Sequence, residues 1–76
     1  MPDGVQAAFG DRVRLHRANA GLSQEKLGEL AGLHRTYIGH VERGEVNPTL
    51  GSIVRLADAL EVDTGELTSG LTAARK

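Results

Sequence analysis

The sequence predicts one compact, all-α domain of five helices. Apolar residues recur at spacings of three and four along the chain, which is the period of amphipathic helices. Only two prolines occur among the 76 residues, and glycines separate the apolar runs as helix-stop residues do. A chain of this length has apolar surface for a single core. We therefore expect one domain over residues 1–76, with a core at about 6–70 and a frayed tail at 71–76.

The first two helices are bounded by recognisable stop and cap residues. The first is predicted over residues 6–19 and is closed by Gly21. Ser23 is a typical N-cap for a second helix over residues 24–31, and Gly32 supplies its C-terminal break. The side chains expected to face the core are Phe9, Val13, His16 and Ala20 in the first helix, and Leu27, Leu30 and Ala31 in the second.

The third and fourth helices carry the next two apolar stripes. The third is predicted over residues 35–43 and ends at Gly44, where a positive φ costs least. Thr49 is the expected cap of the fourth helix, over residues 50–60, which has the clearest periodicity in the chain. The inward residues are Ile38 and Val41 in the third helix, and Leu50, Ile53, Leu56, Ala57 and Leu60 in the fourth.

A short fifth helix is predicted near the end of the chain. Asp63 and Glu66 have the spacing of a capping box, and the helix is expected to run through Leu67 to about Ser69. Leu67 and Leu71 are apolar residues near the edge of a small domain. We therefore expect the fourth and fifth helices and the chain ends to form a dimer interface.

The segment from Gln24 to Arg43 predicts a helix-turn-helix unit. Its two helices are joined only by residues 32–34, and helices connected so tightly cross at a steep angle. Gly28 allows the two backbones to approach, and Gly32 permits the turn. These features are requirements of packing, so taken alone they predict a helix pair without indicating a ligand.

The residues of the third helix that packing does not require point to DNA. They form a face almost free of carboxylates, made of Arg35, Thr36, Tyr37, Gly39, His40 and Arg43. Arg35 can pair with guanine O6 and N7, Thr36 offers a hydroxyl and a methyl group to base edges, and His40 can bond a base or a phosphate. Tyr37 has two open interpretations, a core-edge ring or a phosphate contact.

Other residues are candidates for contacts with the DNA backbone. Gln24 begins the second helix, where free N–H groups and the helix dipole favour a phosphate. Arg43, Asn47 and Thr49 are expected to complete a clamp on the backbone.

The string SQEKLGELAGLHRTYIGHVERGEVNPTL resembles the XRE family of Cro/repressor-type helix-turn-helix proteins, and most of all the controller proteins of restriction–modification systems. The resemblance implies a lambda-repressor-like domain that binds an operator as a dimer. It also implies that the helix with Arg35, Thr36 and His40 reads the major groove, and that Arg17 pairs with Glu42. His16 and His34 depart from the family's usual residue types, which bears on local geometry.

Charge alone does not predict a nucleic-acid binder. The net charge is −1, but residues 45–71 contain Arg55 alone against five Asp and Glu residues, so the acidic charge is concentrated in the C-terminal third. A site that includes Arg14, Arg35 and Arg43 can therefore be locally positive. Cysteine is absent, and the three histidines lack metal-ligand spacing. We expect no catalytic activity, no cofactor and no bound metal.

These observations favour a transcriptional regulator that reads a short palindromic operator. The expected partners are double-stranded operator DNA and a second copy of the chain, with RNA polymerase as a further candidate. The start of the chain lacks a signal-peptide pattern, and no apolar run approaches the length of a membrane span, so a cytoplasmic protein is expected. The alternative is an antitoxin or another protein-interaction subunit that uses its acidic helices to hold a partner.

Overall fold

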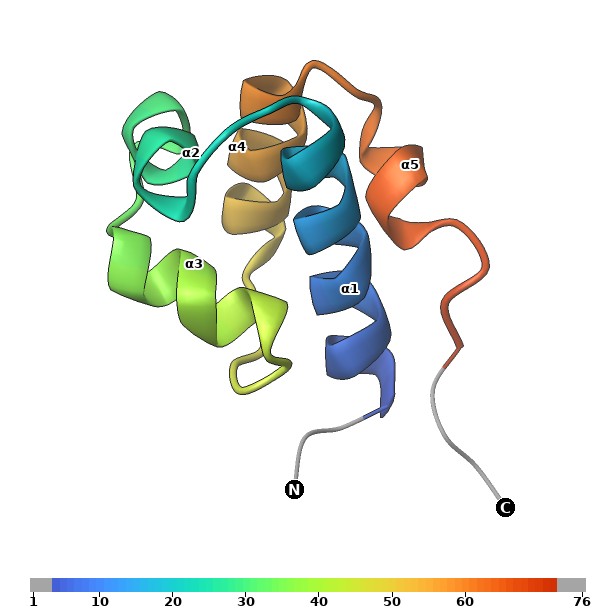
Figure 1. The fold of residues 1–76 in the computed structure, drawn as a ribbon. Helices are drawn as coiled ribbons and strands as arrows, with labels where there is room; N and C mark the ends of the chain where they lie inside the picture. The colour runs from blue at the N-terminus through green and yellow to red at the C-terminus, as the bar shows by residue number, and fades with distance from the viewer. Residues whose placement is uncertain (1–3, 73–76) are drawn as a thin grey trace.

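The computed structural model describes residues 4–72, and the regular elements within that range are all α-helices (Figure 1). They are α1 (Gly4–Asn19), α2 (Gln24–Ala31), α3 (Arg35–Glu42), α4 (Leu50–Leu60) and α5 (Thr64–Thr68). The five-helix prediction is confirmed, with α1 beginning two residues earlier than expected and α3 and α5 ending one residue earlier. Most of the predicted frayed tail, residues 73–76, lies outside the described residues.

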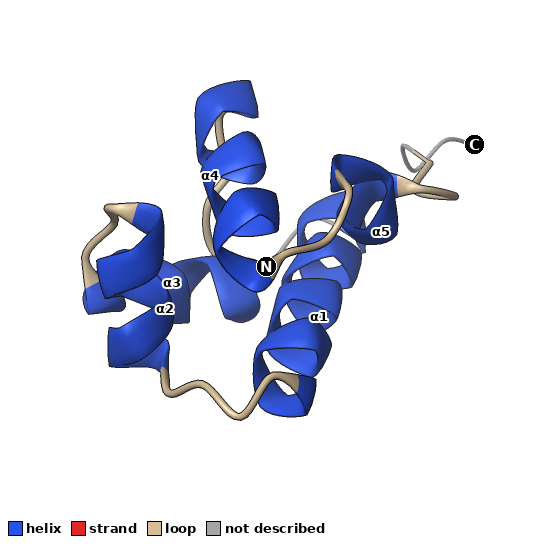
Figure 2. Ribbon diagram, turned by 90° about the horizontal axis from the view of Figure 1, so that it is seen from above, coloured by secondary structure: helices blue, strands red, loops and turns tan. Residues whose placement is uncertain are grey.

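The helices enclose a single apolar core. Helix α1 packs against α3, α4 and α5, and α2 packs against α3 and α4. Figure 2 shows α4 and α1 on opposite sides of the bundle, with the α2–α3 pair at one end and α5 at the other. The buried apolar side chains are Phe9, Val13, Leu27, Ala31, Ile38, Val41, Leu56, Ala57, Leu60 and Leu67.

Several residues expected to face the core lie elsewhere. Ala20 is exposed beyond the end of α1, and Leu30 is 52% exposed because it lies on the outer side of α2. Leu50 is 77% exposed, since it is the first residue of α4 and precedes the turn that reaches the core. Leu67 was expected at a dimer interface, but it is fully buried, so it is unavailable to a partner. Leu71 is half-buried against the core.

The helix caps explain why the element boundaries were predictable. The Ser23 hydroxyl accepts a hydrogen bond from the Lys26 N–H, and Thr49 accepts one from the Ser52 N–H. The His34 Nδ1 accepts from the Thr36 N–H at 3.0 Å, so an imidazole caps α3 in place of a hydroxyl or carboxylate. Asp63 makes no side-chain cap, so the predicted capping box is wrong.

No helix within residues 4–72 combines the length and the apolar character that crossing a membrane requires.

Candidate nucleic-acid interface

Close backbone contacts fix the position of α3. A Cβ atom on Gly28 would lie 2.5 Å from the Leu33 carbonyl oxygen, so this glycine lets the turn lie directly against α2. Gly32 has φ 72°, the left-handed conformation that reverses the chain after α2. Ile38 and Val41 anchor the inner side of α3 in the core. The predicted helix-turn-helix is confirmed, and α3 is packed on its inner side while Arg35 and Thr36 at its start are exposed.

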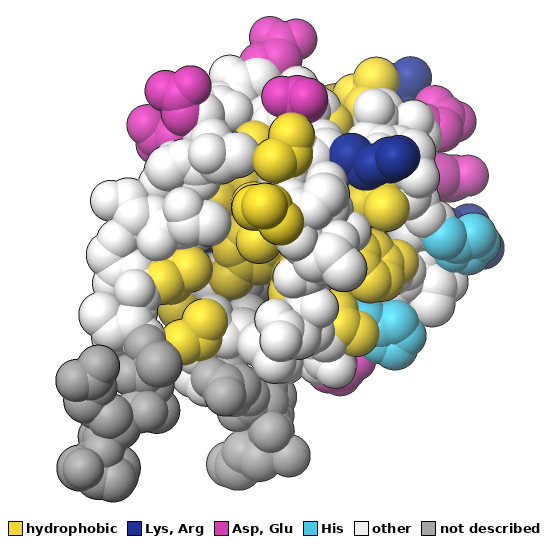
Figure 3. Space-filling model, turned by 180° about the vertical axis from the view of Figure 1, so that it is seen from behind, with side chains coloured by type: hydrophobic (Ala, Val, Ile, Leu, Met, Phe, Trp, Pro, Cys, Tyr) yellow, Lys and Arg dark blue, Asp and Glu magenta, His cyan; other side chains and the backbone are white. Residues whose placement is uncertain are grey.

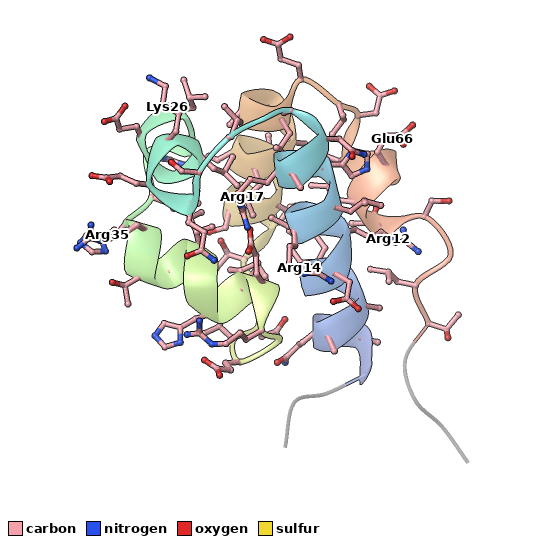
Figure 4. The ribbon with its side chains drawn as sticks, viewed as in Figure 1. Arg12, Arg14, Arg17, Lys26, Arg35 and Glu66 are labelled. Atoms are coloured by element: carbon pink, nitrogen blue, oxygen red, sulfur yellow. The ribbon has the colours of Figure 1, made fainter. Side chains whose placement is uncertain are left out.

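The N-terminal end of α3 presents its side chains to solvent. Arg35 and Thr36 are both exposed, and the Arg35 side chain points away from the bundle (Figure 4). The Arg35 Nη1 lies 3.9 Å from the Glu25 Oε1, an exposed and loose ion pair. A shallow hollow of about 420 Å³ lies beside this turn and is lined by Glu25, Glu29, Leu33, His34 and Arg35. Arg35 is therefore free to reach outward, with Glu25 as a weak competitor.

The C-terminal end of α3 carries a charged cluster of His40, Arg43 and Glu45. The Glu45 carboxylate bonds the His40 Nδ1 at 2.7 Å and accepts from the Arg43 Nε at 3.0 Å. The hydrogen bonds from Arg43 and His40 hold the pKa of Glu45 below its ordinary value. The expectation of a face almost free of carboxylates is therefore wrong at this end, because the chain folds back at Gly44.

Gln24 lies at the N-terminus of α2 but is also part of an internal network. Its Nε2 donates to the Glu42 Oε1 at 3.0 Å, and the same carboxylate accepts from the Arg17 Nε at 2.6 Å and the Arg17 Nη2 at 3.0 Å. Arg17 lies between α1 and α3 (Figure 4), and the hydrogen bond from Arg17 to Glu42 raises the pKa of the guanidinium. The predicted Arg17–Glu42 pair is confirmed. Glu42 thus fixes the Gln24 side chain at the edge of the candidate interface.

Of the remaining candidate residues, some pack inside the fold and others are exposed on its surface. Tyr37 packs its ring against the core, and its hydroxyl lies 3.4 Å from the Ser52 Oγ, which favours the core-edge interpretation. Gly39 was expected to be exposed, but it is buried beneath the Arg43 guanidinium. Asn47 and Thr49 are exposed on the loop before α4, where the Thr49 hydroxyl is engaged as the helix cap.

Arg14 does not join this cluster. It projects from α1 and pairs with Asp11 on the same helix at 3.3 Å. Among the described residues, the exposed basic side chains of the candidate interface are therefore Arg35 and Arg43.

Acidic and apolar side chains characterise the other side of the molecule. Seen from behind, hydrophobic side chains gather in the middle of the face on which α4 lies, and acidic side chains border its upper edge (Figure 3). The exposed apolar residues of α4 are Leu50 and Val54. The exposed acidic residues of α4, α5 and their connection are Asp58, Glu61, Asp63 and Glu66. This distribution agrees with the acidic C-terminal third of the sequence.

Sequence reasoning missed Glu45 as part of the site. Its signal was its position directly after Gly44, whose φ of 73° turns the chain back toward the preceding helix. That turn brings Glu45 within reach of His40, five residues earlier. An acidic residue that directly follows the glycine at the end of a helix can therefore be expected to lie near basic residues in the last turn of that helix.

Comparisons with known proteins identify the family. The model of a family described as "Helix-turn-helix domain" matches residues 8–71. The chain is 44% identical to the control protein C.SmaI of Serratia marcescens, covering 88% of this chain and 87% of that one. It is 40% identical to the control protein C.BamHI of Bacillus amyloliquefaciens, with 88% and 84% covered.

Solved structures give the same assignment. The restriction-modification controller protein C.AhdI from Aeromonas hydrophila superposes with a TM-score of 0.80 at 48% identity, covering 82% of this chain and 94% of that chain. The P22 c2 repressor, solved in complex with a synthetic operator, superposes with a TM-score of 0.76 at 29% identity, again over 82% and 94%. The chain therefore belongs to the XRE-type helix-turn-helix family, and restriction–modification controller proteins are among its relatives.

Proposed function

We propose that this protein is a sequence-specific regulator of transcription that binds a short palindromic operator as a homodimer. The observation that carries the proposal is the closely packed α3, whose exposed end presents Arg35 and Thr36 together. Specific recognition of duplex DNA requires donors and acceptors on an element that fits the major groove. Helix α3 supplies both requirements.

The dimensions of α3 suit this role. Its eight residues span about 12 Å, and a helix with side chains is about 10–12 Å across, close to the width of the major groove. With α3 in the groove, Arg35 pairs with a guanine and Thr36 contacts a neighbouring base edge. His40 and Arg43, further along the helix, lie where the groove is lined by phosphates.

The backbone contacts come from both sides of α3. Gln24 presents the N-terminus of α2 to one phosphate, with its side chain held by Glu42. Asn47 and Thr49 lie on the loop at the other end of α3 and reach a second stretch of backbone. Tyr37 contributes mainly by packing, with its hydroxyl at the edge of the interface. The P22 c2 repressor, a structural relative, was solved in complex with a synthetic operator, which supports operator binding by this fold.

Dimerisation uses the apolar face of α4. Leu50 and Val54 are exposed there, whereas Arg35 projects outward from the start of α3 (Figure 4). Two copies joined by a twofold axis present two α3 helices, and an operator read by both has half-sites about 34 Å apart. Binding then depends on protein concentration through the monomer–dimer equilibrium.

The relatives named as control proteins, together with the restriction-modification controller protein C.AhdI, support a role in regulating a restriction–modification system. Contact with RNA polymerase is a further part of this proposal. Adding polymerase to the operator complex tests it by a change in the mobility of the complex.

Selection of bound fragments from a random duplex pool tests the proposed function. We expect enrichment of a palindrome with half-sites centred about one helical turn apart. Sedimentation on the selected site should give two protein chains per duplex. Recovery of unselected sequences after repeated rounds would contradict the proposal, as would an enriched site without symmetry bound by a single chain.

A further inference from the structure

Glu45 engages both polar side chains at the C-terminal end of the candidate recognition helix. Its two carboxylate oxygens have different partners, with Oε1 on the His40 Nδ1 at 2.7 Å and Oε2 on the Arg43 Nε at 3.0 Å. The Arg43 Nη2 also lies 3.4 Å from the His40 Nδ1, so the three side chains contact one another pairwise. One carboxylate therefore fixes the arrangement of the whole cluster.

The fold does not require the Glu45 side chain. Its backbone N–H closes the end of α3 by donating to the His40 carbonyl at 2.9 Å, and any residue other than proline can make that bond. The side chain itself is 43% exposed and is absent from the core. Gly44 and Val46, on either side, supply the turn and the apolar contact. The carboxylate is thus placed on the recognition surface without a structural need for it.

The position of this carboxylate opposes phosphate binding. Arg43 is one of two exposed arginines at the interface, and its charge is balanced by Glu45 before any DNA arrives. A phosphate that approaches Arg43 must compete with a carboxylate already bonded to its Nε. Contacts with random DNA consist almost entirely of such phosphate interactions.

We infer that Glu45 determines specificity at this interface, by keeping His40 and Arg43 in one fixed arrangement and weakening their attraction to the phosphates of unrelated sequences. The inference rests on the proposed function. At the operator, base contacts by Arg35 and Thr36 supply affinity that Glu45 does not oppose, and the ordered cluster reduces the entropy lost on docking. On random DNA these base contacts are absent, and Glu45 only weakens the binding of phosphates.

The substitution Glu45→Gln tests this inference because it keeps the size of the side chain and one acceptor oxygen, replaces the other oxygen by an amide donor, and removes the charge. Binding is measured by fluorescence anisotropy on the selected operator and on a random duplex of equal length, across a range of salt concentrations. We expect affinity for the random duplex to rise by about threefold to tenfold, with a smaller change on the operator. The salt slope on random DNA should steepen by about 0.9 for each phosphate newly neutralised.

Glu29→Gln is the matched control. It removes the same unit charge from an exposed carboxylate, which pairs with Lys26 on its own helix. We expect this variant to leave the ratio of operator to random affinity unchanged. In a background of Arg43→Ala, Glu45→Gln should change the salt slope much less than it does in the wild type. The guanidinium that the substitution would release from Glu45 is absent from that background.

The outcomes separate this inference from the proposed function. Suppose that the wild-type protein discriminates its operator but Glu45→Gln raises the affinity for both duplexes equally. This result leaves the proposed function intact and overturns the proposed role of Glu45. An effect no larger than that of Glu29→Gln overturns it too. A wild-type protein that fails to discriminate any duplex overturns the proposed function and this inference with it. Helical circular dichroism checks that each variant is folded.

Discussion

Glu42 shows how a buried charge is accommodated in this small domain. Its side chain is only 3% exposed, and its two oxygens accept hydrogen bonds from both Arg17 and Gln24. A buried carboxylate without such donors carries a large desolvation cost. The network connects α1, the start of α2 and the end of α3 at one point.

Replacing Arg17 should therefore destabilise the fold strongly. We expect Arg17→Ala to lower the free energy of unfolding by about 3–5 kcal/mol, because Glu42 is left buried without its main partner. Urea denaturation followed by circular dichroism measures this. The control is Arg14→Ala on the same helix, whose exposed pair with Asp11 is worth at most about 1 kcal/mol. Similar losses in the two variants would contradict the account of the buried network.

The Glu45 cluster makes a prediction about pH. Hydrogen bonds from Arg43 and His40 lower the pKa of Glu45 from 4.5. The stabilisation by this carboxylate is therefore complete above about pH 4.5 and is lost as the pH falls through the lowered pKa. A carboxyl titration by NMR should place the Glu45 midpoint below 4.5, and Arg43→Ala should move it upward. A midpoint that does not respond to Arg43→Ala would show that the ion pair is not formed in solution.

At the scale of the elements, the contact between α1 and α3 depends on Gly10. A Cβ atom there would collide with the Val41 carbonyl oxygen and lie 2.8 Å from the Glu42 carbonyl oxygen. Both neighbours are backbone atoms, which cannot rotate away as a side chain can. Gly10 thus sets the distance between α1 and the C-terminal end of α3.

Gly10→Ala should separate these two helices. We expect a loss of about 1–3 kcal/mol in the free energy of unfolding, since the backbones must shift to admit a methyl group. Gly65→Ala is the control, because a Cβ atom there meets nothing within 4 Å. The control should be neutral or raise stability by about 0.4–1 kcal/mol. Thermal denaturation of the two variants compares them, and a neutral Gly10→Ala would contradict the close contact.

The sequence predicted the elements better than their burial. The bounds of α2 and α4 were predicted correctly because Ser23 and Thr49 are caps, and capping is a local property. Leu30 and Leu50 were assigned to the core because periodicity gives the side of a helix but not what covers it. Gly10 was not identified as a contact residue because its role depends on the distant end of α3.

The candidate site was predicted in the same uneven way. Arg35 and Thr36 are exposed as expected, because their positions follow from the register of α3. Glu45 was missed because its proximity to His40 and Arg43 arises from a chain reversal after the helix. Local pattern therefore identified the residues that project outward, whereas the contact of Glu45 with His40 and Arg43 became apparent only in the tertiary structure.

For the molecule as a whole, the proposed dimer predicts the effect of a charge on α4. Val54 is 40% exposed in the single chain and lies on the apolar face. In Val54→Glu, a twofold interface would hold two unpaired carboxylates, so we expect association to weaken by about tenfold or more. Sedimentation equilibrium measures this, with Leu15→Glu, an exposed apolar position on α1, as the control. Equal association in wild type and Val54→Glu would place the interface elsewhere.

In the proposed function, α3 reads base edges through Arg35. The most direct test measures wild-type protein and Arg35→Ala on the selected operator and on operators with each guanine of the half-site replaced in turn. We expect Arg35→Ala to bind the operator more weakly by about 1–3 kcal/mol and no longer to distinguish one particular guanine, while other positions remain discriminated. A uniform loss of affinity across all the operators, with every preference retained, would contradict it.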